Sequence, residues 1–230
     1  VTTPQVDEQN ATIQITTTVK NDSKNAEEVK ISTIIVDANG KKVTETNSVQ
    51  SLSSGQKAEV GHELNLRNPI RWTIENPYLY SVKTKLYVGN KLKDQYSTPL
   101  GVRSFVFDAE KGFFLNGVHT KIRGVCLHHD LGALGAAVNT RAIERQLEIM
   151  KKMGVNGIRT SHNPPAPELL QLCDRMGFIV MDETFDMWRK KKTAHDYSRY
   201  FNEWHERDLT DHILRDRNHP SVFMWSIGNE

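Results

Sequence analysis

The sequence has no large excess of charge of either sign, because 30 lysine and arginine residues are set against 28 aspartate and glutamate residues. Such a balance produces no field that would attract nucleic acid or an anionic membrane, so neither is expected as a partner. The nearest approach to a basic cluster is the short run at residues 189–192, which we interpret as a solvated loop.

Long apolar segments and a signal-peptide pattern are lacking as well. No apolar run approaches the length that a bilayer requires, so no membrane partner is expected. The first residue is Val1 rather than methionine, which indicates a processed or excised piece. The two cysteines, Cys126 and Cys173, lie within apolar segments, so we expect buried free thiols rather than a disulfide. Two cysteines do not distinguish a periplasmic from a cytoplasmic location.

Residues 1–107 show the two-residue period of β-strands. Apolar and polar side chains alternate over 13–19, and further β-rich runs follow at 29–36 and 78–88. About seven short strands in roughly a hundred residues, with no helical stretch, are typical of an antiparallel sandwich of immunoglobulin-like size. Turn signals separate the strands at Asn39-Gly40, at 53–55 and at Gly89-Asn90.

After Asp108 the pattern changes to short apolar strands that alternate with segments of helical periodicity. The first helix is expected to be capped by Asn139 or Thr140 and to end at Gly154. Its buried face is expected to consist of Ile143, Leu147, Met150 and Met153. Further helices are expected over 164–177 and 200–217, and strands over 121–127, 155–160, 178–181 and 222–227. Three strand-helix repeats and a fourth strand require a parallel sheet, and the periodicity permits either a doubly wound sheet or a barrel.

Each of these four strands ends, at its C-terminal end, in residues suited to polar chemistry. In a (β/α)8 barrel the C-terminal strand ends converge on the face where active sites are built, so four such ends predict a site there. The four clusters are His128, His129 and Asp130; Arg159, Ser161, His162 and Asn163; Asp182, Glu183 and Asp186; and Asn229 and Glu230.

Several of these residues also have a purely structural interpretation. Glu183 would serve equally to cap the following loop, and Asp182 less so. His162, which is followed by Asn163-Pro164, would serve to form a turn. Arg159 requires a nearby carboxylate if it is buried, and in this layout that carboxylate would lie in the site. Trp188 is either a core residue or an aromatic face on which a sugar ring stacks.

A metal hydrolase is a further possibility, since histidines and carboxylates from three strand ends are plausible ligands. Adjacent residues of an extended strand point to opposite faces, so His128 and His129 cannot both bind one interior metal. No metal and no cofactor are therefore expected.

Glu230 is a candidate general acid, because a carboxylate at the end of a buried strand is held protonated near neutral pH by its surroundings. Glycoside hydrolysis needs such an acid and a second carboxylate, which in a retaining enzyme stands about 5–5.5 Å away. Asn229 would then donate a hydrogen bond to the neighbouring sugar hydroxyl. The alternative is that Glu230 is a terminal residue without a role.

These segments resemble glycoside hydrolase family 2. The segment 101–125, with Gly101-Val102-Arg103 and Ile122-Arg123-Gly124-Val125, is similar to the junction between that family's immunoglobulin-like domain and its barrel. The second-strand motif is matched by RTSHNP at 159–164, and the following helix and third strand by CDRMG at 173–177 with Asp182-Glu183. The most specific match is RDRNHPS at 215–221 together with WSIGNE at 225–230, which is similar to the family's acid/base signature.

The resemblance implies a role for each matching position. Glu230 would be the general acid/base, Asn229 its substrate-binding neighbour, and Arg159 the residue that orients the nucleophile. The subsite for the terminal sugar would be lined by His128, His162 and Asp182, with Asp186 and Trp188 as further substrate-binding candidates.

Within the family, residues 124–130 and 185–188 are most similar to a group of bacterial β-galactosidases. The better-known lactose-cleaving pattern has Arg-His-Glu in place of Leu127-His128-His129. This departure leaves the exact sugar and any magnesium site open. β-Glucuronidase and β-mannosidase are the alternatives, in that order.

The resemblance also implies parts that this sequence does not contain: a preceding jelly roll, and the last four barrel strands with the nucleophilic glutamate. A complete barrel typically needs about 250 residues. We therefore expect an immunoglobulin-like β-sandwich at 1–107, followed at 108–230 by the first four β/α units of a TIM (β/α)8 barrel.

For the whole protein we expect a retaining exo-β-galactosidase that acts on a carbohydrate substrate. The chain by itself is expected to be inactive, and a non-catalytic truncated module is the alternative from a different class. Unpaired edges at the first and fourth strands predict self-association of the chain. The oligomeric state of the whole protein is left open, with a homo-oligomer as one candidate.

Overall fold

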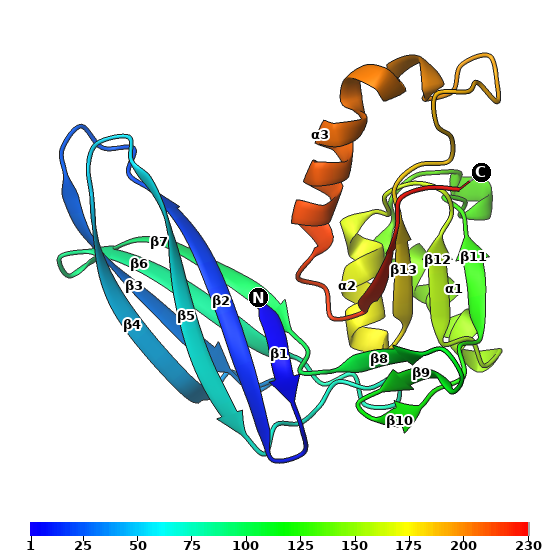
Figure 1. Ribbon diagram of the computed structural model, residues 1–230. Helices are drawn as coiled ribbons and strands as arrows, with labels where there is room; N and C mark the ends of the chain where they lie inside the picture. The colour runs from blue at the N-terminus through cyan, green and yellow to red at the C-terminus, as the bar shows by residue number, and fades with distance from the viewer. Residues whose placement is uncertain (230) are drawn as a thin grey trace. The chain divides into compact units, whose positions relative to one another are not determined.

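The computed structural model describes residues 1–229, and its contacts divide the chain into two compact units. The first, the sandwich unit, comprises Val1–Thr73, Tyr78–Val106 and Leu115–Val118. The second, the parallel-sheet unit, comprises Ile74–Pro77, Phe107–Phe114 and the chain from His119 onward. Figure 1 shows the strands and helices of both units.

The sandwich unit consists of two antiparallel sheets around an apolar core. Burial alternates along β2 because every second side chain points to this core. Inward side chains from both sheets, including Ile13, Ile35 and Leu64, pack in one cluster. One sheet has the order β1 (Thr2–Val6), β2 (Asn10–Lys20), β5 (Lys57–Arg67), and the other β4 (Lys42–Leu52), β3 (Glu27–Val36), β6 (Tyr80–Val88), β7 (Lys91–Leu100).

The predicted turns lie between these strands. Asn39-Gly40 connects β3 to β4, residues 53–55 connect β4 to β5, and Gly89-Asn90 connects β6 to β7. Gly40 and Gly89 have φ angles of 80° and 56°, in the region that favours glycine. Strands β1 to β7 match the expectation of about seven strands over this part of the sequence.

His62 of β5 connects its sheet to two strands of the other sheet. Its Nδ1 lies 2.8 Å from Oγ1 of Thr33, and its Nε2 lies 2.8 Å from Oγ of Ser48. Hydroxyl groups donate or accept, so a neutral imidazole is satisfied in either tautomer. Burial lowers the pKa of His62, which favours this neutral form.

The parallel-sheet unit is built on one sheet in which strands follow one another in sequence order. A doubly wound sheet reverses its strand order at a switch point, so this order favours the barrel interpretation. The strands are β11 (Gly124–Leu127), β12 (Gly157–Thr160), β13 (Ile179–Glu183) and β14 (Val222–Ser226), all parallel. They are connected by the short 3-10 helix η1 (Gly132–Leu134) and α1 (Thr140–Lys152), by α2 (Pro167–Met176) and by α3 (Ser198–Asp216).

The core of this unit lies between the sheet and the helices α1 and α2 (Figure 1). Leu147 of α1, Leu170 of α2 and Val180 of β13 are each fully buried in one apolar cluster. Each such side chain contributes about 1.5–3 kcal/mol relative to an exposed one.

The helix ends differ in part from the sequence-based expectations. Asn139, rather than Thr140, caps α1, and its side chain accepts a hydrogen bond from the Ala142 N–H at 3.0 Å. Met153 is 73% exposed rather than buried, because α1 ends at Lys152 and Met153 is its C-cap. Helix α2 begins at Pro167 rather than Pro164. A residue before proline avoids the helical region, and Ala166 accordingly has an extended backbone.

The two cysteines are both free, but only one is buried. Cys173 lies in the apolar core, as expected, and burial raises the pKa of its thiol well above the usual value. The expectation of burial was wrong for Cys126. It alternates with Val125 and Leu127, which pack against the core, so its side chain lies on the opposite, open face of the sheet.

The segment Ile74–Pro77 is attached to the parallel-sheet unit by Lys151. Its ammonium group donates to the carbonyl oxygens of Ile74 at 3.1 Å, Met176 at 2.7 Å and Gly177 at 2.9 Å. It also lies 4.9 Å from the centre of the Phe178 ring.

A three-stranded sheet of β8 (Phe105–Asp108), β9 (Gly112–Leu115) and β10 (Val118–His119) completes the structure. Among residues 1–229, no helix combines the length and the apolar character needed to cross a bilayer.

Candidate active site

Adjacent carboxylates at the end of β13 point to opposite faces of the sheet. Val180 packs into the core under the helices, so Asp182, two residues on, lies on that helix side. Met181 and Glu183 lie on the other face, which also carries Cys126 and Arg159. This open face is where the side chains of a candidate site come together.

Glu183 is the centre of this group. Its side chain is fully buried, and each of its two oxygens accepts more than one hydrogen bond. Oε2 accepts from Nε of Arg159 at 2.9 Å and from the Ser226 hydroxyl at 2.7 Å. Oε1 accepts from Nη2 of Arg159 at 3.0 Å and lies 2.6 Å from Nδ1 of His162. The carboxylate thus joins β12, β13, β14 and the loop that follows β12.

The charge on Glu183 follows from these contacts. Burial raises the pKa of its carboxyl group, but hydrogen bonds from Ser226, Arg159 and His162 outweigh burial and hold the pKa below its usual value. An ionised carboxylate only accepts hydrogen bonds, so Nδ1 of His162 must carry a proton. The Nε2 atom of His162 is then the ring nitrogen available to a ligand.

Asn229 is held in this group by two contacts. Its Oδ1 accepts from Nη2 of Arg159 at 2.9 Å, and its Nδ2 donates to Oδ1 of Asp186 at 3.2 Å. Asp186 is in turn paired with Lys192, whose Nζ lies 3.0 Å from the same oxygen. These contacts fix which end of the Asn229 amide is oxygen, and they leave one of the two Nδ2 hydrogens for another acceptor.

The remaining predicted residues lie at the rim of the group. The rings of His128 and His162 are 5.4 Å apart and nearly perpendicular. Trp188 packs against Phe201 with ring centres 5.9 Å apart. A Cβ atom added to Gly228 would lie 2.9 Å from the indole, so Trp188 lies directly against the backbone next to Asn229.

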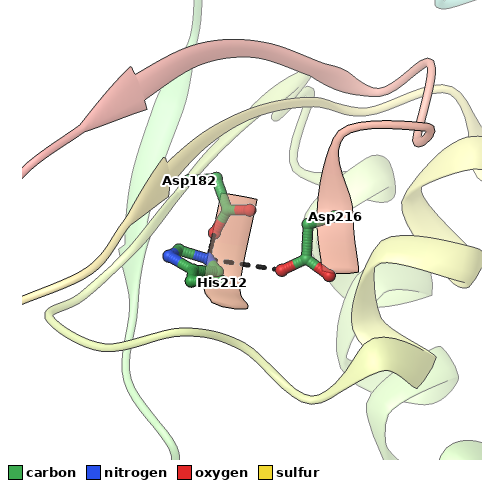
Figure 2. Close-up of side chains that lie close together, drawn as sticks. All are labelled: Asp182, His212 and Asp216. Atoms are coloured by element: carbon green, nitrogen blue, oxygen red, sulfur yellow. Dashed lines mark ion pairs between the residues drawn. The ribbon is translucent and has the colours of Figure 1, made fainter. Parts of the chain in front are cut away.

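Asp182 is not brought together with these residues. Its side chain is fully buried on the helix side of the sheet, and Oδ1 lies 3.0 Å from Nε2 of His212 in α3. Figure 2 shows the His212 imidazole between the carboxylates of Asp182 and Asp216, the second of which lies 3.2 Å away. Burial raises the pKa of Asp182. Burial would lower the pKa of His212, but the two carboxylates outweigh it and raise that pKa.

This cluster of Asp182, His212 and Asp216 has the composition and spacing of a metal site. Its charges favour an ion-pair cluster instead. Arg215 is bound to Asp216, with Nη2 2.5 Å from Oδ2, and the raised pKa of His212 favours its imidazolium form, so both groups bring positive charge to the two carboxylates. A divalent cation in place of the imidazolium proton would add a net positive charge where no solvent screens it. The residues present therefore do not favour a metal here.

Two residues of the signature segment 215–221 fix the start of β14. Nδ1 of His219 lies 2.6 Å from Oδ2 of Asp174 in α2, and the backbone N–H of Ser221 donates to Oδ1 of Asp174 at 3.0 Å. Arg215 also donates to the carbonyl oxygen of Pro165 at 2.8 Å. These residues position β14 from the helix side rather than line the open face.

The pKa values of three histidines are shifted in opposite directions in the two units, down for His62 and up for His212 and His219. The pKa of His62 is lowered by burial, so its contribution to stability is present above the unfolded-state value of about 6.5 and is lost as the pH falls below it. The pKa values of His212 and His219 are raised by their carboxylate partners against the effect of burial. The contribution of these two histidines to folding stability is complete below about pH 6.5 and is lost as the pH rises through the folded-state pKa.

Ring nitrogen NMR of the chain over a pH series tests this expectation, with free imidazole in the same buffer as the reference. His62 should gain its second proton below the reference pKa, and His212 and His219 above it. A His212 ring that is neutral at pH 6 would contradict the ion-pair interpretation of its cluster.

The structure thus joins Arg159, His162, Asp186 and Asn229 in one network, with His128 and Trp188 beside it. Glu230 lies outside the described residues. Two members were not among the predicted site residues. Glu183 was interpreted as equally suited to cap a loop, and Ser226 was not considered. The need of Arg159 for a nearby carboxylate was the sequence signal that pointed toward Glu183.

Comparisons with known proteins were made over the whole chain. Residues 108–230 match the family model described as "Glycosyl hydrolases family 2, TIM barrel domain", and residues 1–103 match the model "Glycosyl hydrolases family 2". The chain is 62% identical over 230 residues to the β-galactosidase BoGH2A of Bacteroides ovatus. The aligned region covers 100% of this chain but 27% of that relative.

Solved structures of related proteins also match this chain over nearly its whole length. A glycosyl hydrolase family 2 member from Bacteroides cellulosilyticus superposes with a TM-score of 0.96 at 44% identity, over 100% of this chain and 30% of that one. The β-glucuronidase of Bacteroides uniformis gives a TM-score of 0.86 at 33% identity, over 97% of this chain and 26% of that one. The chain thus spans less than a third of the length of each of these proteins. The predicted fold class is confirmed: an immunoglobulin-like sandwich is followed by part of a TIM barrel.

Proposed function

The chain belongs to glycosyl hydrolase family 2, and from this premise we propose that the full-length protein containing it is a retaining exo-β-galactosidase. The observation that carries the proposal is the position of Asn229. Its amide is held by Arg159 and Asp186 at the C-terminal end of β14, directly before Glu230. Barrel enzymes place their chemistry at this end of the strands.

The proposed reaction uses these groups as follows. Glu230 protonates the glycosidic oxygen, and a carboxylate from another part of the full-length protein attacks the anomeric carbon from about 5–5.5 Å away. The free Nδ2 hydrogen of Asn229 donates to the sugar hydroxyl next to the reacting carbon. Among residues 1–229, the Nη1 group of Arg159 donates a hydrogen bond to Sγ of Cys126 at 3.9 Å and to no carboxylate. It is therefore placed to orient an incoming carboxylate.

The charges near Asn229 support a neutral sugar. Arg159 is paired with Glu183 and its Nη1 is assigned to the nucleophile, and Lys192 is paired with Asp186, so both of these cations already have a carboxylate partner. A glucuronide would need a cation for its own carboxylate. β-Glucuronidase is the second candidate, because the Bacteroides uniformis enzyme of that name is 33% identical to this chain over an aligned region that covers 26% of the enzyme.

The test is an assay of the full-length protein on aryl β-galactoside, β-glucuronide and β-mannoside. We expect the highest kcat/KM on the galactoside, with retention of the anomeric configuration in the product by NMR. A preference for the glucuronide would establish the second candidate. Turnover of none of the three substrates would contradict the proposal. The 230-residue chain alone is the control and is expected to be inactive, because four strands do not close a barrel.

A further inference from the structure

Glu183 makes more contacts than an ion pair with Arg159 alone would require. Each oxygen is shared between Arg159 and one other donor, Ser226 for Oε2 and His162 for Oε1. Its backbone N–H donates to Oγ1 of Thr160 at 2.8 Å, which fixes the residue itself. A single buried carboxylate thus determines the orientation of two side chains that face the open site.

We propose that Glu183 is a positioning residue, whose buried carboxylate fixes the guanidinium plane of Arg159 and the tautomer of His162. This inference rests on the proposed function, because the two side chains it orients are those placed to bind the nucleophile and the sugar. Arg159 in turn holds the Asn229 amide, so the orientation imposed by Glu183 extends to the residue beside Glu230.

The geometry makes a specific demand on the residue at position 183. Arg159 donates to both oxygens, through Nε to Oε2 and through Nη2 to Oε1. A glutamine amide has one oxygen and one NH2 group, so either orientation sets the NH2 group against an N–H of Arg159. Glu183→Gln therefore keeps the size of the side chain and removes the arrangement that fixes Arg159 and His162.

The kinetic test compares Glu183→Gln with a matched control in the full-length protein. We expect kcat on the aryl galactoside to fall about 100-fold with KM changed far less, since misplacement of catalytic groups by about an ångström has an effect of this size. The control is Glu148→Gln, which makes the same change in an exposed two-point Arg–Glu pair with Arg141 on α1 and is expected to leave kcat unchanged. If Glu183→Gln retains kcat within about twofold of the control, the proposal is wrong.

A second measurement keeps the proposal testable where that variant does not fold or where no substrate is turned over. Ring nitrogen NMR of His162 in the unmodified chain reports which nitrogen carries the proton when the imidazole is neutral. We expect Nδ1–H throughout, because Glu183 faces that atom at 2.6 Å. A neutral His162 with its proton on Nε2 would overturn the proposal. Absence of turnover with Nδ1–H present would count against the proposed function and leave the positioning role standing.

Discussion

Glu230→Gln in the full-length protein is expected to lower kcat/KM on an alkyl β-galactoside by about 10²–10⁴-fold, which is the usual contribution of a positioned general acid. An alkoxide is a poor leaving group and must be protonated as it departs. A dinitrophenolate leaves without a proton, so the first step with a dinitrophenyl galactoside should be much less affected. Steady-state and pre-steady-state rates on the two substrates measure the difference.

The second step of the proposed reaction supplies the control. The same carboxylate then acts as a base on water, so the variant should accumulate the glycosyl-enzyme intermediate from an activated substrate. Azide needs no base and should restore turnover, with β-galactosyl azide as the product. Glu203→Gln, an exposed position on α3, should behave as the unmodified protein. An equal loss on both substrates without azide rescue would assign Glu230 another role.

Gly177→Ala is expected to destabilise the parallel-sheet unit by about 3–5 kcal/mol, near the upper end for a single substitution. Gly177 ends α2 with a φ of 73°, where a side chain costs about 1–2 kcal/mol. A Cβ atom would also lie 2.1 Å from the carbonyl oxygen of Ile74 and 2.8 Å from its carbon. These are backbone atoms, so the segment itself must move to make room. Urea unfolding of the chain, followed by tryptophan fluorescence, measures the loss.

Gly154→Ala is the matched control for this prediction. Gly154 follows the end of α1 with a φ of 86°, but a Cβ atom there would meet nothing within 4 Å. This substitution should therefore carry the backbone cost alone, about 1–2 kcal/mol. Equal losses for the two substitutions would show that the contact between Gly177 and Ile74 contributes nothing.

Local signals predict most elements of this fold because their causes are local. The alternation along β2, the Asn139 cap and the glycines after α1 and α2 each act within a few residues. The start of α2 was misplaced because two prolines at 164 and 165 resemble a helix start, whereas the deciding residue is Pro167, which keeps Ala166 extended. The burial of Cys126 was misjudged because its apolar neighbours show that the strand is buried on one face, not which residue points there.

The same limitation explains what the sequence could not determine about the site. Asp182 and Glu183 are adjacent, both acidic and both fully buried, and the residues before them, Val180 and Met181, are both apolar. Periodicity therefore does not distinguish the carboxylate that faces the helices from the one that faces the site. Only long-range partners do so: His212 and Asp216 on one side, Arg159 and His162 on the other.

The attachment of Ile74–Pro77 to the parallel-sheet unit changes where that compact unit begins in the sequence. The barrel family model starts at residue 108, yet Lys151 donates to the Ile74 carbonyl and Gly177 lies against the backbone of Ile74. A polypeptide cut at residue 108 would lose that carbonyl and uncover Gly177 and the end of α2. The compact unit defined by its contacts therefore includes a segment more than thirty residues upstream of the boundary that sequence similarity assigns.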